Sequence, residues 1–354
     1  MPMKINAGIV GVTGYSGQEL LRGLLRHPNV RVEWLSSLRL ERARPIGEIL
    51  PAWRGLPLKV EPFRVSDAVR RTDLLFLCLP HAAAMKIAPA LLKGSKVRII
   101  DLSADFRLRS PALFRRAYGV RHASPGLLAQ AAYGLTEWNR DRIRRARLVA
   151  NPGCYPTAVL LGLGPLAESG LLEESGVIAD AKSGVSGAGR SPKEELLFCE
   201  VNEDFRAYKV NAHPHIPEME QELKRWSGKP ARLTFVPHLA PLNRGLYATL
   251  YVRFLRGIGK SQLRALYSKR YGNEPFIRLL ADGVWPQVKS VAGTNFCEIG
   301  LQAGEDNRSA IVLSAIDNLG KGAAGQAIQN MNLLCGFPET AGLIPSADLK
   351  ETAG

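Results

Sequence analysis

The sequence predicts an α/β protein, with a doubly wound parallel sheet in a first domain and an α+β second domain built on a mixed sheet. Short apolar runs alternate with helical patterns over residues 1–150, which indicates parallel strands joined by helices. Longer strand patterns follow one another after residue 150, which indicates an antiparallel or mixed sheet. A chain of 354 residues also exceeds the size of one comfortable core, so two domains are expected.

The elements of the first domain follow from apolar runs and from leucine spacing. Strands are predicted at 6–10, 30–36, 74–79 and 97–102. Helices are predicted over 81–92 and over 14–26, where the pair His27-Pro28 ends the pattern. Strands that alternate with helices form a parallel sheet, because each helix carries the chain back across the sheet.

The second domain is predicted from longer strand patterns at 232–236, 246–254 and 310–316. An alanine- and glycine-rich stretch at 318–334 predicts a helix whose small residues suit close packing on the first domain. The expected domains are therefore 1–150, completed by 318–354, and 151–317.

The composition limits the partners and the compartment. The net charge is +15, but the basic residues are spread along the chain, and the dense stretch 139–148 lacks aromatic residues. This pattern favours anionic substrates or phosphorylated cofactors over nucleic acid. No apolar run reaches the length of a membrane helix, and the first residues lack a signal-peptide core.

Five cysteines without regular spacing predict free thiols in a reducing cytoplasm. No C-x-x-C pair is present, so no structural zinc site is expected.

Gly11, Gly14 and Gly17 lie three residues apart between the first predicted strand and the first predicted helix. This spacing is typical of a dinucleotide site, where glycines allow a tight turn and a close approach to the pyrophosphate. The end of the second strand carries Ser36, Ser37 and Arg39 where an NAD site has an acid. Hydroxyls and an arginine suit a 2′-phosphate, so NADP(H) is the predicted cofactor.

Cys154 lies in the stretch NPGCYPTA, and Pro156 predicts the start of a helix there. A thiol at a helix N-terminus has a lowered pKa and can act as a nucleophile, although a capping turn with an incidental thiol gives the same pattern. His213 and His215 precede a helix that starts near Pro217, in a segment predicted to be extended. They suit a base oriented by Glu218 better than a metal site, because no third ligand is nearby.

These stretches, together with LSADFR (102–107), SGVSGAGR (183–190) and DNLGKGAAGQAIQN (317–330), resemble the N-acetyl-gamma-glutamyl-phosphate reductase family of the aspartate-semialdehyde dehydrogenase superfamily. The resemblance runs in order over nearly the whole chain. It implies a cytoplasmic, NADP-dependent homodimer or homotetramer of arginine biosynthesis, in which the second domain is catalytic and oligomerises. One departure from the family is Leu38, which stands before Arg39 where the family more often has arginine.

The resemblance also assigns roles. It implies Cys154 as nucleophile, His215 as acid/base and Glu218 as the acid that follows it. Independently of the resemblance, Arg107 and Arg190 are candidates for binding the substrate phosphate, since an arginine fork matches its oxygens. His213 is a further candidate for binding the substrate. The residues expected at the cofactor are Gly11, Thr13, Gly14, Tyr15, Ser16, Gly17, Ser36, Ser37, Arg39, Ser186, Gly187 and Asn318.

The implied reaction is reduction of an acyl phosphate through a thioester on Cys154, followed by hydride transfer from NADPH and proton transfer by His215. Three alternatives remain open. A lysine-pathway relative reduces a carrier-linked aminoadipyl phosphate, and the positive charge would suit its acidic carrier protein. Against it, the resemblance implies that this relative has Gly-Ala-Gly-Cys-Asn where this chain has NPGCYP. Aspartate-semialdehyde dehydrogenase is disfavoured by the NPGCYPT and HPHIPE stretches. A non-catalytic protein that senses NADP or binds nucleic acid would require the thiol and histidines to be incidental.

Overall fold

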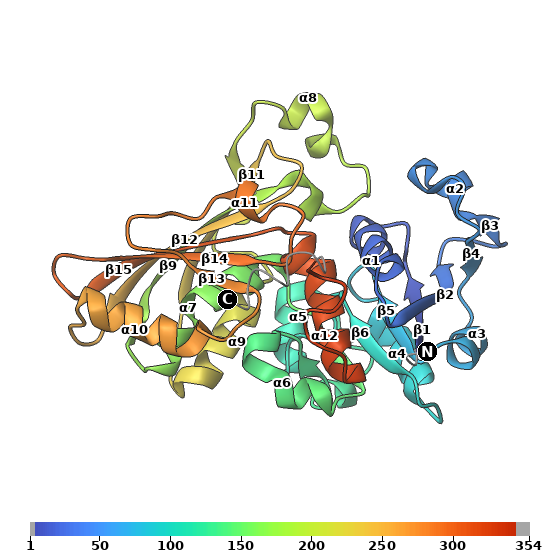
Figure 1. The fold of residues 1–354 in the computed structure, drawn as a ribbon, viewed down its shortest axis with the longest axis horizontal. Helices are drawn as coiled ribbons and strands as arrows, with labels where there is room; N and C mark the ends of the chain where they lie inside the picture. The colour runs from blue at the N-terminus through green and yellow to red at the C-terminus, as the bar shows by residue number, and fades with distance from the viewer. Residues whose placement is uncertain (1–3, 345–354) are drawn as a thin grey trace. The chain divides into compact units, whose positions relative to one another are not determined.

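The structure, a computed structural model, describes residues 4–344. The chain divides into two compact units (Figure 1). Unit 1 contains the residues up to Pro152 and the segment that begins at Ala323, and unit 2 is Gly153–Gly322. The part of the predicted first domain beyond residue 344 lies outside the described residues.

A mostly parallel sheet forms the centre of unit 1. In the described residues its strand order is β3-β4-β2-β1-β5-β6-β8-β7, and every neighbouring pair is parallel except β3 with β4. The strands are β1 (Ile5–Val10), β2 (Val30–Ser37), β3 (Arg44–Pro45), β4 (Lys59–Pro62), β5 (Leu74–Leu77), β6 (Arg98–Asp101), β7 (Ala132–Tyr133) and β8 (Leu148–Ala150). The predicted parallel, doubly wound sheet is confirmed.

Helices connect these strands. They are α1 (Tyr15–Leu25), α2 (Ile46–Ile49), α3 (Val65–Arg71), α4 (Ala84–Leu92), α5 (Pro111–Tyr118), α6 (Thr136–Arg144) and α12 (Gly325–Cys335), with short 3₁₀ turns η1 (Pro51–Trp53) and η2 (Pro125–Leu127). The single helix predicted over 318–334 is wrong in its first part. A π-helical turn, η5 (Gly320–Ala324), comes first, and α12 starts after it.

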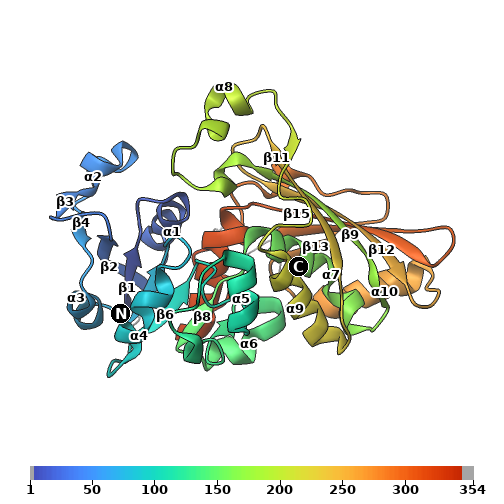
Figure 2. The ribbon, with the colours of Figure 1, turned by 180° about the vertical axis from the view of Figure 1, so that it is seen from behind.

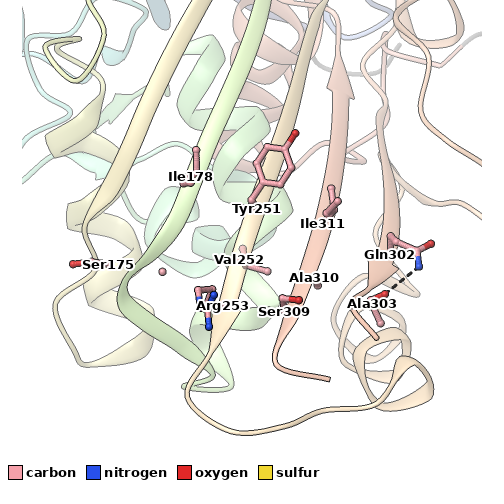
Figure 3. A pocket seen from close by; sticks show the side chains of 12 residues that line it. Ser175, Ile178, Tyr251, Val252, Arg253, Gln302, Ala303, Ser309, Ala310 and Ile311 are labelled. Atoms are coloured by element: carbon pink, nitrogen blue, oxygen red, sulfur yellow. Dashed lines mark hydrogen bonds between the residues drawn. The ribbon is translucent and has the colours of Figure 1, made fainter. Parts of the chain in front are cut away.

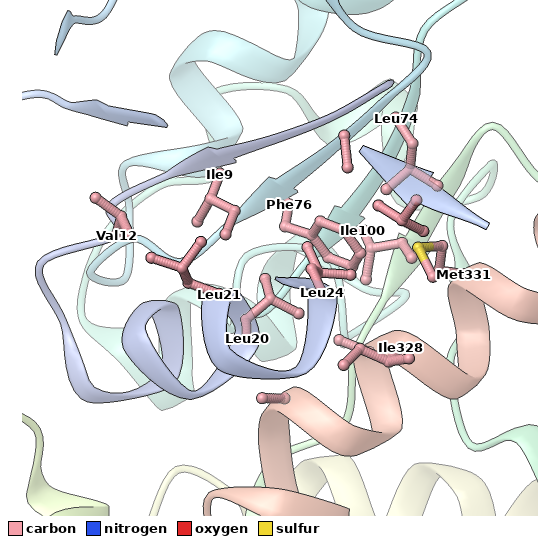
Figure 4. Close-up of a cluster of buried hydrophobic side chains, with 14 of the residues drawn as sticks. Ile9, Val12, Leu20, Leu21, Leu24, Leu74, Phe76, Ile100, Ile328 and Met331 are labelled. Atoms are coloured by element: carbon pink, nitrogen blue, oxygen red, sulfur yellow. The ribbon is translucent and has the colours of Figure 1, made fainter. Parts of the chain in front are cut away.

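The core of unit 1 joins segments that are far apart in the sequence. Leu20, Leu21 and Leu24 of α1 pack with Ile328 and Met331 of α12 in one buried cluster (Figure 4). Gly23 allows this approach, because a Cβ there would overlap the Ile328 side chain. The last described helix therefore completes the core that the first strands begin.

Unit 2 is built on a mixed sheet, as predicted. Its order in the described residues is β10-β11-β9-β12-β15-β14-β13, with parallel pairs β11–β9 and β13–β14 and otherwise antiparallel neighbours (Figure 2). The strands are β9 (Leu172–Gly184), β10 (Arg206–Ala207), β11 (Leu233–Ala240), β12 (Leu246–Phe254), β13 (Ile277–Leu279), β14 (Cys297–Ala303) and β15 (Ser309–Ile316). The helices and 3₁₀ turns are α7 (Cys154–Glu168), η3 (Val185–Ala188), η4 (Glu194–Leu196), α8 (Phe198–Val201), α9 (Ile216–Ser227), α10 (Lys260–Tyr271) and α11 (Val288–Val291).

One face of this sheet is covered by α7, whose residues from Tyr155 to Ala167 are all buried. The other face is open, and side chains that alternate with the buried ones point out from it. Ile178 and Tyr251 are 45% and 43% exposed there. With Ile311 and others they line a hollow of about 430 Å³ (Figure 3). Unit 2 therefore presents a broad, partly apolar surface to solvent.

Candidate active site

Cys154 is the first residue of α7, and Gly153 is its N-cap in an extended conformation. The sequence predicted a start at Pro156, two residues later. Pro156 does not prevent this earlier start. The first N–H groups of a helix have no intrahelical partner, so a proline in the first turn costs no hydrogen bond. The half-buried thiol therefore lies at the positive end of the helix dipole, which favours a thiolate.

The turn after β15 packs directly on Cys154. A Cβ at Gly322 would come within 2.9 Å of the Cys154 Cβ, so the close approach requires glycine. The Gly322 N–H donates to the Asp317 carbonyl at 2.8 Å. The Asp317 carboxylate accepts the N–H groups of Leu319 and Gly320, and it pairs with Arg244 at 2.8 Å. This turn is therefore a rigid wall beside the thiol.

Glu218 lies in the first turn of α9 and is only 1% exposed. Its Oε1 accepts the backbone N–H of Gly153 at 3.0 Å. A buried carboxylate in such a bond is a strong acceptor. Glu218 therefore ties α9 to the residue immediately before Cys154.

The two histidines come together, but not in the predicted extended segment. The Ile216 N–H donates to the His213 carbonyl at 3.0 Å, so the chain makes a turn there. Asn211, at φ 51°, redirects the backbone just before it. The His213 and His215 rings lie 4.6 Å apart between centroids.

The turn also fixes the protonation of His213. The His215 backbone N–H donates to His213 Nδ1 at 3.1 Å, so this nitrogen carries no proton. A neutral imidazole with an acceptor Nδ1 has its proton on Nε2. His213 is therefore a donor through Nε2, a different role from that of an acid/base.

Two tyrosines that the sequence did not single out line the same region. The Tyr155 ring makes edge contacts with His213, His215 and Phe235. The Tyr155 hydroxyl donates to the His238 carbonyl at 3.1 Å, and the Tyr208 hydroxyl donates to Tyr155 at 3.2 Å. Burial raises the pKa of both phenols, and for Tyr208 the pKa rises to about 12. Tyr155 adjoins Cys154 in the sequence, but no local pattern marks Tyr208.

A second group of predicted residues gathers at the end of β9 and β15. The Asn318 side chain donates to Ser186 Oγ at 2.9 Å and accepts the Gly245 N–H at 2.7 Å. A Cβ on Gly187 would lie 3.6 Å from the Asn318 amide nitrogen. Asn318, Ser186 and Gly187 are therefore adjacent, as expected for residues that share one role. Arg190, also predicted, lies just beyond them and is exposed.

In unit 1, the glycine loop has the geometry of a phosphate cradle. Gly11 has φ +90°, and a Cβ there would overlap the Cys78 carbonyl oxygen. The Gly11 N–H donates to the Ser36 carbonyl at 2.8 Å. A Cβ on Gly17 would lie 2.5 Å from the Gly11 carbonyl oxygen. Gly14 is the N-cap of α1, whose first turn has no acidic residue, so these residues fit a dinucleotide pyrophosphate.

The remaining residues of the predicted cofactor group lie around this loop. Thr13, Tyr15 and Ser16 belong to the loop and the first turn of α1, with Tyr15 exposed. At the end of β2, Ser36 and Ser37 are buried and Arg39 is exposed. Ser37 Oγ accepts the Arg39 N–H at 3.3 Å. Arg39 is therefore the accessible cation at the end of β2.

Arg107 is 6% exposed in unit 1, where its guanidinium donates to the carbonyls of Asn151 at 2.8 Å and Leu102 at 3.0 Å. Nearby, burial and the charge of Asp105 raise the pKa of Asp101 to about 7, and Arg107 acts in the opposite direction. Arg107 thus braces the strand ends of unit 1 in addition to any contact with an anion.

Two general features of the described residues bear on function. No group of three or more His, Cys, Asp and Glu side chains in 4–344 is placed to hold a metal ion. Among the helices of the same range, none has the length and apolar content needed to cross a bilayer.

Two family models match the chain. "Semialdehyde dehydrogenase, NAD binding domain" matches residues 6–146, and "Semialdehyde dehydrogenase, dimerisation domain" matches residues 154–318. The chain is 52% identical over 341 residues to an N-acetyl-gamma-glutamyl-phosphate reductase of Halorhodospira halophila, covering 96% of this chain and 98% of that protein. It is 47% identical over 344 residues to the protein of the same name in Geobacter sulfurreducens, with coverage of 96% and 98%.

Solved structures share the fold. An aspartate semialdehyde dehydrogenase II of Vibrio cholerae, complexed with ASA, matches with a TM-score of 0.71 at 18% identity, over 94% of this chain and 99% of that chain. An aspartate semialdehyde dehydrogenase of Candida albicans, solved with NADP, matches with a TM-score of 0.70 at 13% identity, over 94% and 98%. At these identities the likeness concerns architecture, and the predicted fold class is confirmed.

Proposed function

The chain belongs to the N-acetyl-gamma-glutamyl-phosphate reductase family, and we propose that it converts N-acetyl-gamma-glutamyl phosphate to N-acetyl-L-glutamate 5-semialdehyde and phosphate in arginine biosynthesis. The observation that carries this proposal is the position of Cys154 at the start of α7, with Glu218 bonded to the preceding residue. His213 and His215 lie on the turn that leads into the helix of Glu218. A thiol, an acid/base and a donor in one unit are the parts that acyl transfer to sulfur requires.

The glycine loop of unit 1 is the proposed binding site of NADPH. Gly11 and Gly17 leave room for the pyrophosphate, and the N-terminus of α1 offers its N–H groups. Arg39 is proposed to bind the 2′-phosphate. When bound, NADPH supplies the hydride that reduces the thioester.

The chain's own groups carry the other steps. The Cys154 thiolate attacks the acyl carbon, a C–S bond forms, and the C–O bond to phosphate breaks as phosphate leaves. His213 Nε2–H donates a hydrogen bond to an oxygen of the substrate. His215 supplies a proton to the oxygen that becomes negative, and takes it back as the C–S bond breaks and the aldehyde leaves. Glu218 holds Gly153, and with it the start of α7, in place.

The open face of the unit 2 sheet is proposed as the contact between two copies of the chain. Ile178 and Tyr251 are exposed on this face, and Ile311 on the neighbouring strand β15 extends the apolar surface beyond Tyr251 (Figure 3). An exposed apolar surface suits an isologous dimer. Tyr251→Asp should convert the oligomer to monomers in sedimentation velocity, and an unchanged sedimentation coefficient would exclude this face. The enzyme is proposed to work in the cytoplasm.

The decisive assay is the reverse reaction, followed by nicotinamide absorbance with NADP and phosphate present. N-acetyl-glutamate semialdehyde is compared with aspartate semialdehyde and with an aminoadipate semialdehyde on its carrier protein. Phosphate-dependent NADPH formation only with the first supports the proposal. Activity only with the carrier-linked substrate would move the enzyme to lysine synthesis, the alternative whose acidic carrier protein would suit the net charge of +15.

Two cysteine variants test the nucleophile. Cys154→Ala should lose turnover by at least about 10³-fold while binding NADP normally. Cys199→Ser is the matched control, because Cys199 is an exposed thiol on α8, and it should retain full activity. Substantial activity in Cys154→Ala would remove the thioester from the scheme.

Thiol alkylation addresses the non-catalytic alternative. Burial raises the pKa of Cys78 to about 12 and that of Cys335 to about 11, so both stay protonated at neutral pH. In a Cys199→Ser background, iodoacetamide should therefore modify Cys154 first, and N-acetyl-glutamate semialdehyde should slow the modification. Slow alkylation without protection by this ligand would favour a protein that binds NADP without catalysis.

A further inference from the structure

The hydroxyl groups of Tyr155 and Tyr208 form a hydrogen-bonded chain that ends on the His238 carbonyl oxygen. Tyr155 Oη lies 3.1 Å from the His238 carbonyl oxygen, which can only accept, so the proton of Tyr155 is used there. Tyr208 Oη lies 3.2 Å from Tyr155 Oη, so Tyr208 has to donate its own proton to Tyr155. The Tyr208 oxygen is left with lone pairs and no proton to offer.

The Tyr208 phenol stays neutral and keeps this arrangement. Its burial raises the pKa to about 12, and the charge of Cys154 also acts to raise it. No other hydrogen bond to Tyr208 Oη is present among residues 4–344. Tyr208 Oη is therefore an acceptor at neutral pH, bonded to the residue that follows the reacting thiol.

The backbone holds Tyr208 firmly in this position. Its N–H donates to the Pro237 carbonyl at 3.0 Å, beside the strand pair of β10 and β11. The following residues Lys209 and Asn211 have φ of 46° and 51°, so the exposed backbone turns sharply between Tyr208 and His213. The Tyr208 ring also makes an edge contact with the His213 ring at 5.7 Å. The phenol thus lies against the ring of the histidine donor.

The proposed substrate has only one hydrogen-bond donor that could bind to the Tyr208 oxygen. Its phosphate, carboxylate and two carbonyl groups are all acceptors at neutral pH, and the acylamino N–H is its single donor. We propose that Tyr208 Oη accepts the acylamino N–H of the substrate and so selects an N-acylated chain. This inference rests on the proposed function, and it assigns a specificity role to a residue for which the sequence gave no signal.

An acceptor of this kind also rejects a substrate that has an oxygen in place of the N–H. An ester oxygen would face the Tyr208 lone pairs, so both groups would be acceptors and neither bond could form. Leaving a buried polar group without its partner costs more than removing both partners together. The discrimination between amide and ester should therefore depend on the Tyr208 hydroxyl.

The test compares N-acetyl-glutamate semialdehyde with its 2-acetoxy analogue, in which an ester oxygen replaces the N–H. In the wild-type enzyme kcat/KM should favour the amide by about 10- to 100-fold, and Tyr208→Phe should reduce this preference by about 10-fold, the effect of one hydrogen bond. Tyr271→Phe is the matched control, because its hydroxyl donates to the Leu161 carbonyl inside the core. That variant should lose thermal stability and keep the wild-type preference.

A second variant removes the acceptor that fixes the direction of the chain. In Tyr155→Phe, Tyr208 can turn its proton toward the substrate, so the ester should gain in relative kcat/KM more than it does in Tyr208→Phe. An active wild type whose preference for the amide survives unchanged in both variants would overturn this inference alone. A wild type that turns over neither compound would overturn the proposed function, and this inference with it.

Discussion

The Glu218 carboxylate accepts the backbone N–H of Gly153 at 3.0 Å, one residue before the proposed nucleophile. The bond joins the first turn of α9 to the N-cap of α7, and both ends of it are buried. The Glu218 side chain can thereby set where the thiol points.

Loss of this bond should lower activity. Glu218→Ala leaves the buried Gly153 N–H without an acceptor, which costs about 1–3 kcal/mol of stability, and we expect kcat to fall about 100-fold because the start of α7 loosens. Glu218→Gln keeps a carbonyl acceptor and should retain more of both. Thermal unfolding and steady-state kinetics measure the two effects.

Glu222→Gln is the control for that prediction. Glu222 is equally buried on the same helix, but it pairs with Arg225 at 2.7 Å. The control should lose stability with little change in kcat. A Glu218→Ala enzyme with wild-type kcat would show that the bond has no part in positioning.

Substitution of Gly11 should damage unit 1. Gly11→Ala puts a Cβ at φ +90° and into the Cys78 carbonyl, so we expect a loss of about 2 kcal/mol or more and weak NADP binding. At Gly14 a Cβ would have its nearest neighbour at 3.6 Å, and Gly14→Ala should cost less than about 1 kcal/mol. Denaturant unfolding of the two variants side by side makes the comparison. Equal losses would mean that the backbone angle is not what requires glycine at position 11.

Arg39 should set the preference for NADPH over NADH. Arg39→Leu removes the accessible guanidinium at the end of β2, so KM for NADPH should rise about 10-fold or more while KM for NADH stays constant. Arg31→Leu is the control, since Arg31 lies on the same strand and pairs with Glu33 at 2.6 Å. An unchanged ratio of the two KM values in Arg39→Leu would assign the 2′-phosphate to another residue.

Asp101 should make the stability of the protein depend on pH. Its pKa rises from 3.8 to about 7 in the folded state, because burial and the Asp105 charge disfavour ionisation. The folded state therefore holds a proton that the unfolded state releases, and this contribution is present below pH 4 and lost as pH rises to 7. Asp101→Asn should become more stable relative to wild type as pH increases. Thermal unfolding at pH 5 and pH 8 tests this, and a pH-independent difference would contradict it.

The sequence predicted well those elements whose pattern is local. β12 was predicted at 246–254 and is Leu246–Phe254, because alternating side chains along it face the buried and the open side. β9 was not predicted, although it runs from Leu172 to Gly184. Its first residues include Glu173 and Glu174, which break the apolar alternation. These glutamates lie at the solvent-exposed end of β9, and a short window of the sequence does not show that the strand continues there.

Within the site, the sequence identified side chains but not their arrangement. His213 and His215 were placed in an extended segment, whereas a bond from the Ile216 N–H closes a turn around them. Tyr208 gave no signal, because its role depends on the direction of a hydroxyl chain that ends on a carbonyl thirty residues later in β11. Spacing along the sequence predicts which side chains share a helix face. It cannot predict which hydroxyl oxygens still have lone pairs available for a ligand once the hydrogen bonds of the folded protein have formed.

The packing of α12 on α1 also has a consequence for the order of events during synthesis. The leucines of α1 leave the ribosome long before Ile328 and Met331 exist to cover them. Unit 2 lies wholly between these segments in the chain. It can therefore finish folding before the last helix of unit 1 has been synthesised. During synthesis, unit 2 would therefore fold before unit 1 is complete. A chain that ends before residue 325 should leave the apolar face of α1 exposed and bind chaperones.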